Sequence, residues 1–155
     1  MPLESWDCDS CGQLVTAATN HGVVIWRVTD DGRSFDYRIV HKTMDEDPGS
    51  TRCDHGSAGG YPSSLDLRQF LGADGLTMLL SWLNAGPIRG DDSPPKPVSM
   101  GEYVHLVRRV QIPYYEEARQ RFHDEETHRW LGDANEYLPY MPDTLKRISD
   151  GTRGR

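Results

Sequence analysis

Two cysteines separated by two residues, Cys8 and Cys11, carry the clearest chemical pattern in the sequence. A Cys-x2-Cys pair can direct both thiolates at one metal ion from a tight turn, and Gly12 provides the backbone freedom that such a turn needs. A thioredoxin-like redox pair is a less suitable interpretation, because it requires a strand before the motif and a helix that begins at it. The spacing therefore predicts a metal-binding knuckle, and the alternative is an unrelated pair of small residues.

Cys53 is the only other cysteine in the chain, and we expect it to be the third ligand. The candidates for the fourth ligand are His41 and His55, while His21 lies in a predicted turn and is less suitable. Three thiolates and one imidazole select Zn²⁺ over Ca²⁺ or Mg²⁺ and leave no open coordination position for a substrate. We therefore predict one structural zinc ion per chain, with His55 as the alternative to His41 in the ligand set Cys8, Cys11, His41 and Cys53.

The choice between the two histidines depends on a predicted β-hairpin. Residues 23–28 and 34–41 are rich in β-branched and aromatic residues, and Asp31-Gly32 between them is a strong hairpin turn signal. In this register residue 41 pairs with residue 22, so His41 lies beside the knuckle if residues 13–20 form a loop. If residues 13–18 instead add a third strand to the sheet, the knuckle lies about 20 Å away and His55 becomes the ligand.

The same hairpin predicts a face of the sheet. By period-two alternation, Phe35, Tyr37, Ile39 and His41 fall on one side of the second strand.

Leucine and helical spacing dominate the sequence after Pro62. A short helix over 65–71, capped by Ser63 or Ser64, precedes a second helix over 75–83 that Asp74 caps. In the second helix Leu76, Leu79, Leu80 and Leu83 recur at helical spacing, which predicts a stripe that faces the core.

The remaining elements follow from proline, glycine and capping signals. The segment 89–97 is rich in proline and glycine and is predicted to be a mobile loop. Ser99 with Glu102 forms a capping box that begins a helix, and Pro113 begins a longer helix through residue 131. Residues 142–149 predict a last short helix.

These elements define an α+β fold, with an N-terminal zinc knuckle and β-hairpin followed by several short helices. We place the knuckle and hairpin in residues 1–62 and the helices in residues 63–150, packed together as one domain. Only 36% of the 155 residues are hydrophobic. Since the mean hydropathy is -0.67, a metal ion would supply stability that a small apolar core lacks.

Charge and cysteine content limit the compartment and the partners. The net charge of -7 disfavours a nucleic-acid partner, because a phosphate backbone is also negative. No stretch is apolar and long enough to span a membrane. The N-terminus carries Glu4 and Asp7 where a signal peptide would be basic and then apolar, so we expect a cytoplasmic protein. In a reducing compartment an odd number of cysteines argues against a disulfide framework and favours metal binding or a reactive thiol.

Residues 5–54 contain four features in order: the segment WDCDSCGQ, a valine-rich strand, a strand that has aromatic residues near its start and ends in a histidine, and the segment RCD. This order resembles small uncharacterised actinobacterial and actinophage proteins that combine an N-terminal Cys-x2-Cys with a later His and Cys-Asp. The resemblance implies that His41 is the ligand, although the segment from Lys42 to Arg52 is longer here. It implies no activity.

Three functions remain open from the sequence. The first is a zinc-stabilised, non-enzymatic module for protein–protein interaction or regulation. The second is a nucleic-acid-binding transcriptional regulator that uses Arg108 and Arg109 beside the zinc unit; we expect these arginines to lie on a solvated face of mixed charge instead. The third is a metal-dependent hydrolase, which would need a pocket of convergent polar groups or a metal-bound water.

Overall fold

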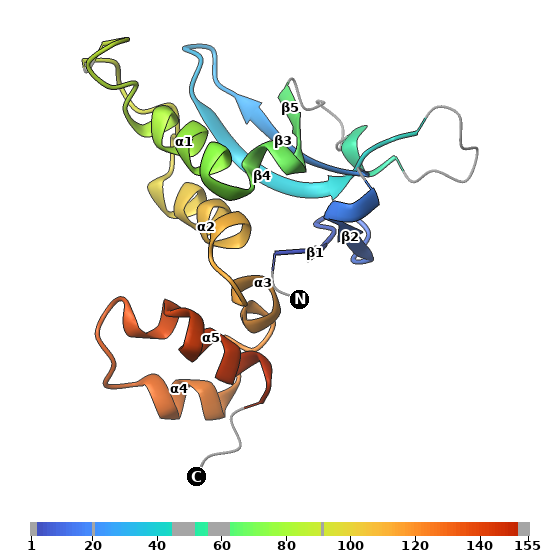
Figure 1. Cartoon of the computed structure of the whole chain (residues 1–155), viewed down its shortest axis with the longest axis vertical. Helices are drawn as coiled ribbons and strands as arrows, with labels where there is room; N and C mark the ends of the chain where they lie inside the picture. The colour runs from blue at the N-terminus through green and yellow to red at the C-terminus, as the bar shows by residue number, and fades with distance from the viewer. Residues whose placement is uncertain (1–2, 20, 45–51, 56–62, 91, 152–155) are drawn as a thin grey trace.

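The structure is a computed structural model that describes residues 3–19, 21–44, 52–55, 63–90 and 92–151, without the side chain of His55. Antiparallel strands come first in the chain and helices follow them (Figure 1). The fold is therefore α+β, as the sequence predicts, with a hairpin of strands at the N-terminal side.

The strands form two small antiparallel sheets. β1 (Ser5–Asp7) pairs with β2 (Leu14–Thr16) as a separate hairpin. The second sheet has the strand order β4-β3-β5, formed by β3 (Gly22–Val28), β4 (Ser34–His41) and β5 (Ser63–Asp66). Short 3₁₀ helices connect the elements: η1 (Ala17–Thr19), η2 (Cys53–His55), η3 (Leu67–Phe70) and η4 (Leu138–Tyr140).

The predicted β3–β4 hairpin is confirmed, and so is the predicted pairing of residue 22 with residue 41, because Gly22 pairs with His41. The predicted face of β4 is wrong at one position. The register shifts between Ile25 and Arg27, opposite a left-handed residue at Asp36, so Phe35 pairs with Arg27 and leaves the face of Tyr37 and Ile39. A β-bulge thus interrupts the strict alternation that the sequence analysis assumed.

The helix predicted over 65–71 is also wrong. Residues 63–66 form β5, which pairs with β3 through Val24 and Leu65 among other residues. Only the 3₁₀ turn η3 follows, and its cap is Asp66, whose side chain accepts a hydrogen bond from the backbone N–H of Arg68. Pairing with a buried neighbouring strand here outweighs the weak helical preference of a polar segment.

Helix α1 (Gly72–Leu83) exists as expected, but a different face is buried. Gly75, Leu79 and Trp82 face the core, whereas Leu76 and Leu80 are 39% and 55% exposed. A Cβ atom at residue 75 would lie 2.1 Å from the backbone of Phe70. Glycine at this position therefore allows α1 to approach η3 closely, and in this orientation Leu79 of the predicted stripe is buried while Leu76 and Leu80 remain exposed.

The C-terminal half contains more breaks than the sequence predicts. Ser99 caps α2 (Met100–Gln111) by accepting a hydrogen bond from the N–H of Glu102, as expected. The single helix expected from Pro113 to residue 131 is wrong, because α3 (Tyr115–Arg119) and α4 (Glu125–Leu131) are separate. Helix α5 (Pro142–Ser149) matches its prediction. No helix in the described part of the chain is long and apolar enough to cross a membrane.

The loop before α2 is held at its C-terminal end. The N–H of Lys96 donates to the Trp82 carbonyl, and Pro97 is buried in a parallel bridge with Ser34. The end of the segment predicted to be mobile is thus attached to β4 and to α1.

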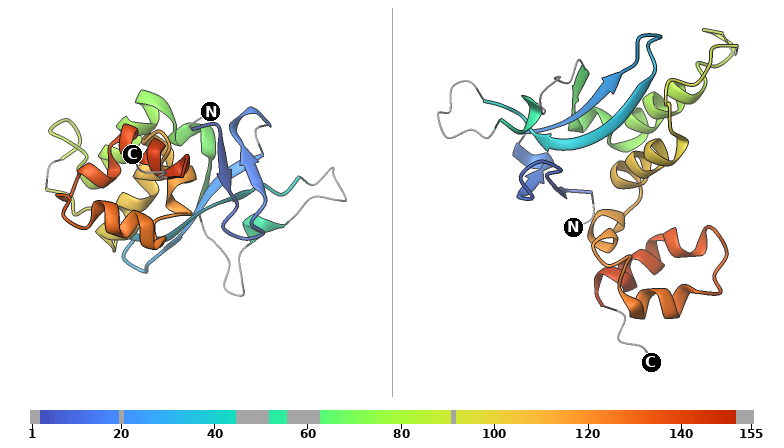
Figure 2. Two further views of the ribbon diagram at one scale, coloured as in Figure 1. Left: turned by 90° about the horizontal axis from the view of Figure 1, so that it is seen from below. Right: turned by 180° about the vertical axis from the view of Figure 1, so that it is seen from behind.

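Two groups of buried side chains hold the molecule together. The larger one extends from Trp6 to Val110 and contains an aromatic set formed by Trp26, Phe70, Trp82 and Tyr103. Strands and helices thus share one core. The smaller one joins α3 to α5 through Tyr115, Ala118, Leu145 and Ile148. Figure 2 shows α4 and α5 at the end of the molecule farthest from the three-stranded sheet.

Candidate metal centre

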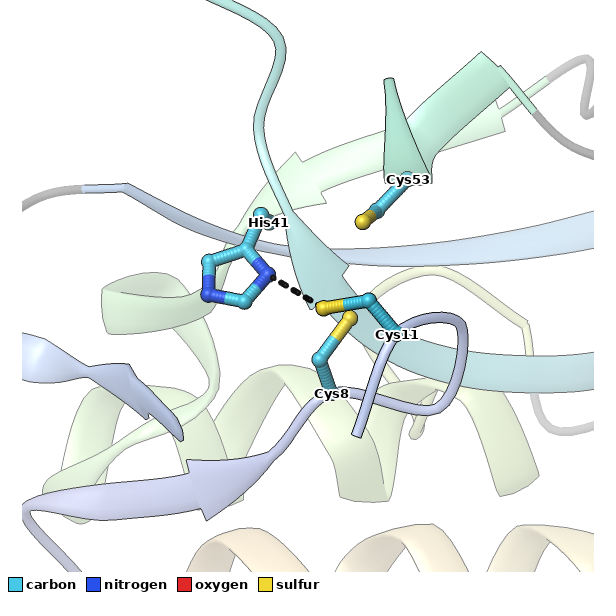
Figure 3. Close-up of side chains that lie close together, drawn as sticks. All are labelled: Cys8, Cys11, His41 and Cys53. Carbon is cyan, nitrogen blue, oxygen red and sulfur yellow. Dashed lines mark hydrogen bonds between the residues drawn. The ribbon is translucent and has the colours of Figure 1, made fainter. Parts of the chain in front are cut away.

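Four of the predicted ligands lie together at one end of the sheet. The Sγ atoms of Cys8, Cys11 and Cys53 and a ring nitrogen of His41 all lie within 4.8 Å of one another. They come from the knuckle, from the end of β4 and from η2, and their side chains converge on one point (Figure 3). The cluster can hold one metal ion.

The two N-terminal cysteines lie in the turn that connects β1 to β2. The N–H of Cys8 donates to the Gln13 carbonyl and the N–H of Gly12 donates to the Cys8 carbonyl, both over 2.9 Å. Gly12 has a left-handed backbone with φ of 76°, which favours glycine. These bonds close a tight loop that leaves Cys11 exposed and Cys8 buried.

The knuckle is attached to the edge of β4 by Asp9, the residue after Cys8. Its N–H donates to the Ile39 carbonyl over 2.9 Å, and its carboxylate accepts the N–H of Ile39 over 2.7 Å. Residues 14–16 do form a strand, but this strand pairs with β1 and does not extend the β3–β4 sheet. The knuckle therefore lies beside the C-terminal end of β4, where His41 is.

The ring of His41 is oriented by the backbone. Its Nε2 lies 2.9 Å from the carbonyl oxygen of Leu14, and its Nδ1 lies 3.4 Å from Cys11 Sγ. A carbonyl oxygen can only accept, so Nε2 carries the proton and Nδ1 of the neutral ring presents a lone pair to the sulfurs. A hydrogen bond of this kind is typical of metal-binding histidines.

Cys53 reaches the cluster because η2 is held against the chain that follows β4. The N–H of Thr43 donates to the Asp54 carboxylate over 2.9 Å, and the Thr43 hydroxyl also bonds to it. Cys53 is 8% exposed. The side chain of His55 lies outside the described residues, so its position as the alternative ligand stays a prediction.

His21, the less suitable candidate, is not part of the cluster. Its side chain is exposed, and its carbonyl oxygen accepts the N–H of Lys42.

The surroundings of the cluster favour the thiolate of Cys8. Burial raises the pKa of this thiol, but the backbone N–H groups of Cys11, Ser10 and His41 outweigh burial and lower the pKa to about 7. The N–H of Gln13 lowers the pKa of Cys11, yet partial burial and the neighbouring sulfurs raise it above its ordinary value. Metal binding requires thiolates, and the backbone N–H groups around the cluster favour a thiolate within this pair of neighbouring cysteines.

The pKa of the His41 imidazole is also set by opposing effects of burial and hydrogen bonding. Burial lowers the pKa of His41, whereas hydrogen bonds to Cys53, to the Leu14 carbonyl and to Cys8 raise it above its ordinary value. A bound cation would favour the neutral ring, which is the form that ligates a metal.

A buried ion-pair network lies behind the knuckle and was missed by the sequence analysis. The Arg109 side chain is 3% exposed and pairs with Glu116 over 2.8 Å and with Asp9 over 2.5 Å. It also donates to the Asp7 carbonyl, while its own carbonyl accepts the indole N–H of Trp6. The network joins α2 and α3 to the turn that carries the cysteines.

This network corrects the expectation of a solvated face of mixed charge. Arg109 is enclosed, and Arg119 pairs with Glu116 over 2.9 Å. The guanidinium of Arg108 lies 3.7 Å from the ring centre of Tyr140. Because Arg109 is enclosed by carboxylates, it cannot contribute to the basic surface that the nucleic-acid hypothesis requires.

Comparisons with family models, with curated proteins and with solved structures gave no match. The resemblance of residues 5–54 to actinobacterial and actinophage proteins therefore stays a prediction. The interpretation of the centre depends on its own geometry.

Proposed function

We propose that the chain is a zinc-stabilised, non-enzymatic module that binds another protein. The observation that carries the proposal is the convergence of Cys8, Cys11, His41 and Cys53 from three separate segments onto one point. The partner, the single zinc ion and the cytoplasmic location belong to the proposal.

Zinc is the ion that best suits this donor set. Three sulfurs and one imidazole nitrogen match the structural zinc sites of proteins, in which four protein ligands leave no position for a substrate. Ligand atoms around tetrahedral Zn²⁺ lie about 3.3–3.8 Å apart, so a displacement of about 1 Å would bring the present atoms into the coordination shell. Such a site has a structural role.

The ion would act mainly on folding. The ligands are up to 45 residues apart in sequence, from Cys8 to Cys53, and they do not converge in an unfolded chain. Binding to the folded form alone therefore stabilises it, by on the order of 10 kcal/mol for structural zinc sites. Thiolate ligands persist in a reducing compartment, which supports the cytoplasmic location.

A protein is the partner that the surface best supports. The net charge of -7 opposes binding to nucleic acid, and Arg109 is enclosed in ion pairs. Several large apolar side chains are exposed, among them Leu76 and Leu80 on α1. Apolar side chains exposed together are typical of protein interfaces.

Native mass spectrometry and a chelator titration test the zinc site. We expect one zinc ion per chain, and we expect EDTA or a stronger chelator to lower the thermal unfolding midpoint and to change the near-ultraviolet circular dichroism. A His123→Ala variant is the matched control, because His123 lies on the C-terminal helical part and should retain the metal. A metal-free protein that is fully folded and insensitive to the chelator would contradict the proposal.

A further inference from the structure

The leucine stripe of α1 forms one wall of an apolar groove. Leu76, Leu80 and Leu83 line it from α1, and Val104 and Val107 line it from α2. Buried Leu79 and Tyr103 form its floor, and the volume is about 290 Å³. The two helices lie side by side in Figure 1, and together they present ridges between which a third helix can pack.

The groove is lined mainly by apolar side chains, and one arginine is among its lining residues. Arg108 is the only charged residue among those that line it. Its guanidinium lies over the ring of Tyr140 at one end, and no carboxylate pairs with it within the residues that the structure describes. The Tyr103 hydroxyl on the floor donates to the Leu79 carbonyl, so this polar group is already satisfied.

We propose that this groove binds an amphipathic α-helix of another protein, with apolar side chains on the leucine wall and a carboxylate that pairs with Arg108. The inference rests on the proposed function, since it names the surface and the chemistry of the partner. A helix fits because its apolar side chains at positions i, i+3, i+4 and i+7 match walls built from residues at the same spacing. The carboxylate fits because Arg108 lies at the end of an otherwise apolar surface.

A second copy of the chain fits less well. In a symmetric pair each groove would face the same groove of its partner, and the only charged lining residue on both sides would be Arg108. Among the described residues, none that lines the groove is acidic and could pair with it. A bilayer surface of anionic lipid is opposed by the net charge of -7.

The test uses the full chain loaded with zinc and a phage-displayed library of helix-forming peptides. We expect the enriched peptides to carry apolar residues at i, i+3 or i+4, and i+7, together with one Asp or Glu. A synthetic copy of an enriched peptide is then titrated by fluorescence anisotropy against wild-type protein and three variants: Leu80→Glu, Arg108→Glu and Ile88→Glu.

Leu80→Glu should weaken binding about tenfold or more, whereas Ile88→Glu is the matched control and should bind as wild type does. Ile88 is 95% exposed and lies outside the groove, so it tests whether any added charge has the same effect. Arg108→Glu should weaken binding of the acidic peptide, and a peptide in which Lys replaces the acidic residue should recover it.

Three results would overturn the inference: no enriched peptide that depends on Leu80, equal binding to Leu80→Glu and wild type, or a dimer in sedimentation that Leu80→Glu dissociates. Zinc content and circular dichroism are measured on each variant. If wild type and Leu80→Glu both retain zinc and fold but bind the peptide equally, the groove is wrong and the metal centre stands. If a chain that never held zinc binds the peptide and Leu80→Glu weakens that binding, the metal centre is wrong and the groove stands.

Discussion

Arg109 on α2 donates from Nη1 to the carboxylate of Asp9 over 2.5 Å, and Asp9 follows the first cysteine of the knuckle. The same carboxylate accepts the N–H of Ile39 on β4. One side chain therefore connects the metal-binding turn to the sheet and to the helices. Any change that displaces the turn should affect the packing of α2 and α3 against it.

Replacing Arg109 with Met should destabilise the zinc-loaded protein by about 3 kcal/mol, because Glu116 is then left buried without its main partner. The free energy of unfolding in urea measures the effect. Arg129→Met is the control: Arg129 pairs with Glu125, and the side chains are 75% and 89% exposed. Loss of such a surface pair should change stability by less than about 0.5 kcal/mol. Similar losses of unfolding free energy in the two variants would show that the buried ion pairs stabilise the protein no more than a surface pair does.

Replacing Asp9 with Ala should lower zinc affinity about tenfold, since groups that orient metal ligands typically contribute a factor of this order or more. The variant loses the bond to the Ile39 N–H and the pair with Arg109, so only the backbone bond from residue 9 to the Ile39 carbonyl still holds the knuckle beside His41. Competition with a chromogenic chelator measures the affinity. Ser10→Ala, also between the cysteines, should leave the affinity unchanged because only the backbone N–H of Ser10 interacts with Cys8.

The candidate centre could be predicted because its signals are local. The Cys-x2-Cys spacing and Gly12 define the turn, and the hairpin predicted from Asp31-Gly32 brings His41 opposite Gly22, once the β-bulge between Ile25 and Arg27 has shifted the pairing by one residue. Two-residue spacings and hairpin registers depend on few neighbours. The position of the knuckle relative to the sheet does not follow from the sequence, because it depends on whether residues 14–16 pair with β1 or with β3.

The rest of the fold depends on contacts between distant segments. β5 is a polar segment that becomes a strand only because β3 accepts it as a neighbour. The buried face of α1 is set by the contact of Gly75 with the backbone of Phe70, which leaves Leu76 and Leu80 exposed. A periodic pattern shows that a helix is amphipathic, but it cannot show which of two adjacent stripes meets the core.

The ligand set is tested by single substitutions. His41→Ala should release zinc during size-exclusion chromatography with a mild chelator, and His55→Ala should retain it. Cys11→Ser should weaken binding less than Cys53→Ser, because Cys11 is exposed and Cys53 is buried, and exclusion of water strengthens the metal–sulfur bond. His21→Ala is the control for loss of an exposed imidazole. Equal zinc retention in the His41 and His55 variants would show that the ligand set is wrong.

Acid should remove the contribution of Glu116 to stability. Burial raises the pKa of its carboxyl, but the hydrogen bonds and charges of Arg109 and Arg119 outweigh burial and hold the pKa below its ordinary value of 4.5. The unfolded chain then binds a proton at higher pH than the folded chain does. The stabilisation by Glu116 is therefore complete above about pH 4.5 and is lost as the pH falls through the lower pKa of the folded state.

The difference in unfolding free energy between wild type and Glu116→Gln isolates this effect, because loss of zinc in acid affects both proteins alike. At pH 7 we expect wild type to be more stable by about 3 kcal/mol, since Gln leaves the buried Arg109 without its full counter-charge. The difference should decrease as the pH falls below 4.5, where the unfolded chain takes up a proton, and become small once the pH is below the lowered pKa of the folded carboxyl. Glu125→Gln is the control, because the Glu125 side chain is 89% exposed and its difference from wild type should stay near zero at every pH. A difference for Glu116→Gln that stays constant from pH 7 to pH 3 would mean that the carboxylate charge does not stabilise the contact between the knuckle and the helices.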